Sequence, residues 1–174
     1  MKNTLTTTGA PGWLWANLAA MGISLVHTIA DYGIILGFSP SLQVDQSVLT
    51  SVLTVLIGLV YTWWAWVLVQ AVGGTRSGLV GLMAFDVLWV GLNGVTIFAC
   101  LPPCGTALPF YADAIHLGTL ILGPLAAYLA YRAIRPARVP SSWLAMAGNV
   151  VIMVALLAAI FAVLGWFANT AGAS

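Results

Sequence analysis

The chain has 174 residues, of which 61% are hydrophobic and only 5% are charged, with a formal net charge of +1. Soluble domains carry about 25% charged residues, so this chain lacks the polar side chains needed to cover a water-facing surface. Because it has only five basic residues, no basic face is available, and we expect no binding to nucleic acid. The composition predicts an integral membrane protein with the lipid bilayer as its main partner.

Five apolar stretches are long enough to cross a bilayer as helices, which takes about 20 residues at a rise of about 1.5 Å each. The first stretch is longer than the roughly 7–15 apolar residues of a signal peptide, so we expect it to be a membrane span. Strands are not expected, because the stretches lack the alternation of barrel strands. The sequence therefore predicts one all-α transmembrane domain over residues 1–174. Its predicted helices cover residues 12–37, 47–72, 78–101, 109–134 and 141–167.

The basic residues predict the orientation of this bundle. With five spans, the N-terminus lies on the same side as the second and fourth loops, and this side holds every lysine and arginine of the chain. The positive-inside rule places that side in the cytoplasm and the C-terminus outside, in the inner (plasma) membrane of a prokaryote. The basic residues are Lys2, Arg76, Arg132, Arg135 and Arg138.

The tryptophans are predicted to form belts at the two membrane surfaces, as amphipathic rings do. Only Trp89 lies well inside a predicted span. The inner belt would hold Trp13, Trp15, Trp63, Trp64, Trp66 and Trp143, and the outer belt would hold Trp166.

Two predicted helices each carry a histidine and an aspartate. His27 and Asp31 on the first are four residues apart, and Asp113 and His116 on the fourth are three apart, so each pair shares one helix face. By helical rise, His27 lies about 15 Å and His116 about 10 Å below the outer ends of their helices. If these two helices pack together, the four side chains form one cluster in the outer half of the membrane.

Three interpretations of this cluster remain open. Each aspartate could simply orient the histidine of its own helix, or the pairs could line a wet vestibule near the headgroups. Alternatively, the cluster could be a substrate or proton site, because a histidine beside a carboxylate exchanges protons readily. In the third interpretation, the cluster binds zinc or copper, or His27 and His116 ligate a haem iron. No dense metal-binding motif such as H-E-x-x-H occurs.

The third predicted helix carries Asp86, Trp89 and Asn93, whose spacing places them on one α-helical face. Asp86 has no basic residue to pair with inside a span, and a charge there costs at least about 2.5 kcal/mol. It could be satisfied by the hydroxyl of Thr62 or the amide of Asn149. In the functional interpretation it holds a proton or pairs with a cationic ligand, against the π-face of Trp89.

Cys100 and Cys104 flank Leu-Pro-Pro at the outer end of the third predicted helix. Outside a bacterial inner membrane the compartment is oxidising, so we expect a local disulfide between them. A thiol redox role, free thiols and soft-metal binding remain as alternatives, although the spacing is not C-x-x-C.

Three functions are compatible with these residues. In the first, the protein binds a small apolar or amphiphilic molecule, which it also converts by acid/base chemistry or transports. Trp89 and Asn93 would bind that molecule. In the second the chain is an accessory subunit that docks partner membrane helices, and in the third it is a haem or metal protein. The sequence names no cofactor. The candidate proton-transfer groups are Asp86, His27, Asp31, Asp113 and His116.

Overall fold

A computed structural model describes residues 11–38, 46–92, 110–137 and 139–171, together with their side chains except those of 30–38, 46, 47, 110–116 and 167–171. All regular secondary structure in these residues is helical, with no strand, and the non-helical connections carry one isolated β-bridge between Thr75 and Val139. The helices are α1 (Gly12–Phe38), α2 (Gln46–Val72), α3 (Arg76–Ala84), η1 (Phe85–Val90), α5 (Phe110–Ile134) and α6 (Trp143–Ala171). The segment η1 is a π-helix that continues α3 directly.

The predicted helices are confirmed as helices, with ends within four residues of those expected. The third helix is the exception in detail. It begins at Arg76, because the Thr75 side chain accepts a hydrogen bond from the Gly78 N–H and caps the helix there. It then widens into η1, which the sequence did not predict, and its predicted end at residue 101 lies outside the described residues.

Three of the helices are long and apolar enough to cross a membrane, over Val48–Val72, Leu117–Ile134 and Trp143–Trp166. Their outward faces carry large apolar side chains, such as Val69, which is 67% exposed, and Val151, which is 64% exposed. Water disfavours such continuous apolar faces, whereas lipid accommodates them. These findings support a membrane protein.

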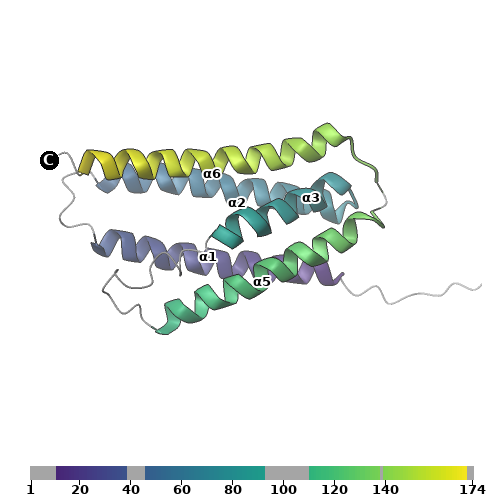
Figure 1. Ribbon diagram of the computed structural model, residues 1–174, viewed down its shortest axis with the longest axis horizontal. Helices are drawn as coiled ribbons and strands as arrows, with labels where there is room; N and C mark the ends of the chain where they lie inside the picture. The colour runs from purple at the N-terminus through teal and green to yellow at the C-terminus, as the bar shows by residue number, and fades with distance from the viewer. Residues whose placement is uncertain (1–10, 39–45, 93–109, 138, 172–174) are drawn as a thin grey trace, which may run out of the picture.

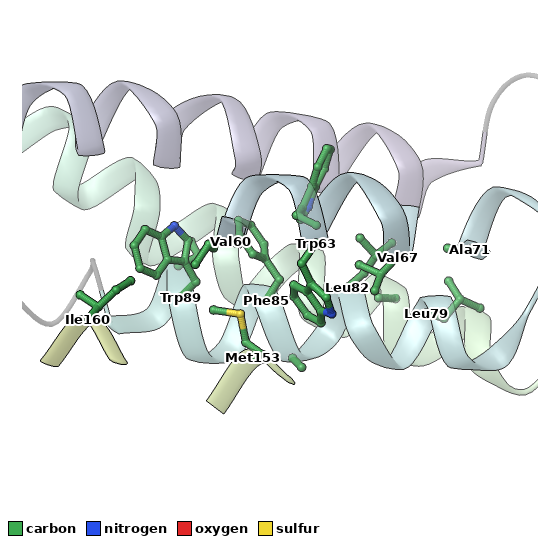
Figure 2. Packing of buried hydrophobic residues seen from close by; sticks show 14 of the residues in the cluster. Val60, Trp63, Val67, Ala71, Leu79, Leu82, Phe85, Trp89, Met153 and Ile160 are labelled. Carbon is green, nitrogen blue, oxygen red and sulfur yellow. The ribbon is translucent and has the colours of Figure 1, made fainter. Parts of the chain in front are cut away.

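Figure 1 shows α2 and α6 running along one side of the molecule and α1 and α5 crossing on the other, with α3 between them. The apolar core lies mainly where α2, α3, η1 and α6 meet. Figure 2 shows Phe85 and Trp89 of η1 close to Val60 of α2 and to Met153 and Ile160 of α6. This core is tightly packed because glycines let α3 approach α2: a Cβ at Gly81 would lie 2.6 Å from Val67 Cγ1.

Two of the predicted belt tryptophans belong to this core instead. Trp63 and Trp64 are only 7% and 3% exposed, and the Trp64 ring contacts Phe85 with centroids 6.0 Å apart. Their prediction as belt residues was therefore wrong, because both rings are packed inside the bundle. In contrast, Trp15, Trp66, Trp143 and Trp166 are each at least 60% exposed, as belt residues are.

The turn between α2 and α3 is joined to the segment before α6. The Val139 N–H donates to the Gly74 carbonyl at 3.1 Å, and the Arg76 N–H donates to the Val139 carbonyl at 3.3 Å. Next to this bridge, the Asn149 amide of α6 donates to the Ser77 carbonyl of α3 at 2.8 Å. Gly74 has a φ of 82°, which a non-glycine residue rarely adopts. These bonds fix α6 relative to α3.

Candidate functional site

Buried polar side chains gather on one side of the bundle. The least exposed polar residues, each at most 1% exposed, lie on α1, α5 and η1, and these three elements pack against one another. We call this set the polar interior. Polar side chains within a membrane-spanning bundle are costly in lipid and therefore face the bundle interior, so such a set is a candidate functional region. Its described members are Asn17, Ser24, His27, Asp86 and Thr119.

The packing of α1 against α5, on which the predicted histidine cluster depends, is confirmed. The two helices touch where Ile23 covers Gly118, which has no side chain to hold them apart. By helical rise, His27 lies about 6 Å and His116 about 3 Å beyond this contact, both toward the end of the bundle where α1 ends and α5 begins. Their backbones therefore occupy similar levels, as expected. The side chains of Asp31, Asp113 and His116 lie outside the described residues.

Asp86 belongs to the π-helical turn η1. The Gly91 N–H donates to the Asp86 carbonyl, five residues earlier, which widens the turn so that residues four apart align. Val90, one turn after Asp86, faces Gly123 of α5, where an added Cβ would lie 2.7 Å from Val90 Cγ1. Asp86 is therefore on the side of η1 that packs against α5.

The widened turn also separates Asp86 from Trp89, which an α-helix would have placed on one face. The Trp89 ring lies against Tyr61 of α2, edge to face, with centroids 6.3 Å apart. Trp89 is therefore part of the wall between the polar interior and the apolar core, while Asn93 lies outside the described residues.

Neither carboxylate oxygen of Asp86 has a hydrogen-bond partner among the described residues, although the side chain is only 1% exposed. Both partners considered from the sequence bond elsewhere. The Thr62 hydroxyl donates to the Gly58 carbonyl of its own helix at 2.8 Å, and the Asn149 amide donates to Ser77. Because a buried carboxyl group without a partner is costly, Asp86 is the member of the polar interior that most needs a ligand.

Tyr61 links the polar interior to the lipid-facing side of α1 and α2. Its hydroxyl lies 3.0 Å from the Thr28 hydroxyl and 3.3 Å from the Ser24 hydroxyl. A groove of about 340 Å³ between these helices is lined by Leu25, Thr28, Ile29, Thr54, Ile57, Gly58 and Tyr61. The Tyr61 ring thus borders the groove on one side and contacts Trp89 on the other.

The sequence reasoning missed Tyr61, Ser24, Asn17 and Thr119. A signal for two of them was present, because Asn17 and Ser24 precede His27 by ten and three residues and share its helix face. Serine and threonine are common in membrane helices, where they bond to their own backbone, so that signal alone is weak. Tyr61 could be recognised only from the packing of α2 against η1.

Asp86 and His27 lie at different levels along the bundle. Gly123, which marks the level of Asp86, is five residues from Gly118, and Ile23 is four residues from His27. Added along the helix axes, these steps place the backbones of the two residues at levels about 13 Å apart. A single metal ion cannot bridge that distance, whereas an elongated organic molecule can.

The predicted metal site falls partly, and the predicted disulfide wholly, outside the described residues. Among the described side chains no group of three or more histidines, cysteines, aspartates or glutamates could hold a metal ion, but three of the four residues of the predicted cluster are not among them. Cys100 and Cys104 also lie outside, so their disulfide stays a prediction.

Comparisons with protein families, with curated proteins and with solved structures give no match for this chain. The polar interior of α1, α5 and η1 therefore carries the functional argument by itself.

Proposed function

We propose that this chain is an inner-membrane protein of five transmembrane helices, with a cytoplasmic N-terminus, that binds a small amphiphilic molecule in its polar interior. Three spans follow from α2, α5 and α6. The other two would be α1, which has 27 residues, and the helix that starts at Arg76. The sorting of the basic residues to one side supports this number of spans and the orientation.

The observation that carries the proposal is the Asp86 carboxyl group, buried between η1 and α5 with no partner among the described residues. Burying such a group without compensation would cost several kcal/mol. A ligand that donates a hydrogen bond or carries a positive charge would remove this cost, and the chain has no lysine or arginine within a predicted span core to do so.

The distance between Asp86 and His27 defines the shape of the ligand. A molecule that reaches both groups must be about 13 Å long, with a donor at one end and a polar group at the other. Between the two levels the interior contains the hydroxyls of Ser24 and Thr119. This combination fits a narrow, mostly apolar molecule with polar ends.

The groove between α1 and α2 supports entry from the lipid. Its volume of about 340 Å³ lies within the range of small-molecule sites, about 300–1,000 Å³. The Tyr61 ring lies between this groove and Trp89, so rotation of that ring would open a path from the groove toward the polar interior. Once the ligand is bound, His27 and Asp86 are placed to exchange protons with it, which would permit acid/base conversion or proton-coupled transport.

Extraction of the purified protein followed by mass spectrometry tests this function. Asp86→Asn removes the charge at nearly constant shape, and Thr62→Val removes a hydroxyl that bonds only within α2. We expect an amphiphilic compound to copurify with the wild type and with Thr62→Val, and to be lost from Asp86→Asn. Identical extracts from all three proteins would refute the proposal.

A further inference from the structure

Figure 1 shows the start of α1 and the end of α5 at the same end of the bundle. A second pocket, unrelated to the polar interior, opens there. Its volume is about 700 Å³, within the range of small-molecule sites, about 300–1,000 Å³. The first turn of α1, the turn after α2 and the last turns of α5 form its walls. The lining includes Trp13, Gly73, Leu129, Arg132 and Ala137, and no acidic residue.

Arg132 supplies the charge of this pocket. Its Nη1 donates to the Tyr128 hydroxyl at 2.9 Å, and its guanidinium carbon lies 5.8 Å from the centre of the Tyr128 ring. These contacts orient the side chain while using one of its five N–H donors. A guanidinium group binds two phosphate oxygens in parallel, which makes it well suited to a phosphate ligand.

The surrounding backbone is compatible with an anion. The first turn of α1 borders the pocket, and the start of a helix carries a partial positive charge. The Leu14 N–H already donates to the Pro11 carbonyl at 2.9 Å, which leaves the N–H groups before it to face an anion. The carbonyls at the ends of α2 and α5, which also border the pocket, would oppose an anion, but several of them are already bonded within the chain. Those of Val69 and Ala71 accept from the Gly73 and Gly74 N–H groups at 3.0 and 2.9 Å.

We infer that this pocket binds the phosphate of an anionic phospholipid from the leaflet on the basic side of the membrane. Basic pockets between helices at the cytoplasmic surface are suited to such headgroups. The membrane-crossing stretches of α2 and α5 end beside the pocket, at Val72 and Ile134, which places it at headgroup depth. The exposed Leu18 and Leu125 on α1 and α5 offer an apolar surface for the acyl chains.

Native mass spectrometry of the full-length protein in detergent, titrated with phosphatidylglycerol, phosphatidylcholine or inorganic phosphate, tests this inference. Arg132→Gln removes the charge in the pocket, and Arg132→Lys keeps the charge but loses the paired geometry. Arg135→Gln is the matched control, because Arg135 is exposed near the same helix end but does not line the pocket.

We expect the wild type to retain phosphatidylglycerol in preference to phosphatidylcholine. Arg132→Gln should weaken phosphatidylglycerol binding about tenfold, Arg132→Lys by less, and Arg135→Gln by less than about twofold. Equal losses in Arg132→Gln and Arg135→Gln would overturn the inference in favour of nonspecific surface charge. Displacement of the lipid by inorganic phosphate would overturn it in favour of a free-phosphate site. Because Asp86 does not line this pocket, lipid binding at Arg132 can be confirmed or refuted independently of ligand binding in the polar interior.

Discussion

Substitution of Gly123 by alanine perturbs the contact between α5 and η1, on which the enclosure of Asp86 depends. An added Cβ would lie 2.7 Å from Val90 Cγ1, 3.2 Å from Val90 Cβ and 3.3 Å from the Asp86 carbonyl oxygen. The first distance is too short for two nonbonded carbon atoms, so α5 or η1 must move. The substitution therefore pushes apart the two elements that cover the Asp86 side chain.

The loss of stability caused by Gly123→Ala can be estimated against a matched control, Gly22→Ala. Overpacking a close helix contact costs about 1–3 kcal/mol. Alanine is also a better helix former than glycine by about 1 kcal/mol, which would hide part of the loss. Gly22→Ala on α1 gains the same propensity and meets nothing within 4 Å. We therefore expect Gly123→Ala to be about 1–3 kcal/mol less stable than Gly22→Ala.

The assay is unfolding of the purified variants in mixed micelles, followed by circular dichroism. A double variant makes it specific, because Val90→Ala removes the atom nearest to the added Cβ. The destabilisation by Gly123→Ala should then be smaller in the Val90→Ala background than in the wild type. If Gly123→Ala is as stable as Gly22→Ala, or if the two effects simply add, α5 and η1 do not pack in the way described.

Three further predictions concern the helix contacts and the chemistry. Gly78→Ala should cost at least about 3 kcal/mol in the same unfolding assay, because the added Cβ would lie 2.7 Å from the backbone carbonyl carbon of Gln70, which cannot move aside. Tyr61→Phe should lower stability by about 1 kcal/mol through the loss of two membrane-buried hydrogen bonds, whereas an unchanged unfolding transition would contradict the contacts with Ser24 and Thr28. An absorption spectrum and metal analysis of the purified protein should show neither a Soret band nor stoichiometric metal, and either finding would favour the haem or metal hypothesis instead.

The helices were predictable because membrane spans have a clear sequence pattern. Each needs about 20 apolar residues, and glycine and proline residues mark the loops between them. The widening of the third helix at Phe85–Val90 has no comparable sequence pattern. The sequence Phe-Asp-Val-Leu-Trp-Val is compatible with an α-helix, and in the structure η1 packs against α1, α5 and α6, which its own six residues do not specify.

The candidate site was predictable only in part. Asp86 and His27 could be recognised from the sequence, because ionisable residues inside a span are expensive wherever they point. The neighbours of Asp86 could not be recognised, because Thr62 and Asn149 were equally reasonable partners until their own bonds to Gly58 and Ser77 were known. Likewise, the inward direction of Trp63 depends on which helix covers that side of α2. Such choices are determined by packing, which a single sequence does not specify.

The most direct test of the central claim is a density map of the protein purified with its native lipids. We predict an elongated non-protein density between α1, α5 and η1, with one end within hydrogen-bonding distance of the Asp86 carboxyl group and extending about 13 Å toward His27. A map in which that carboxyl group is hydrogen-bonded to a side chain of the protein, with no additional density beside it, would contradict the account.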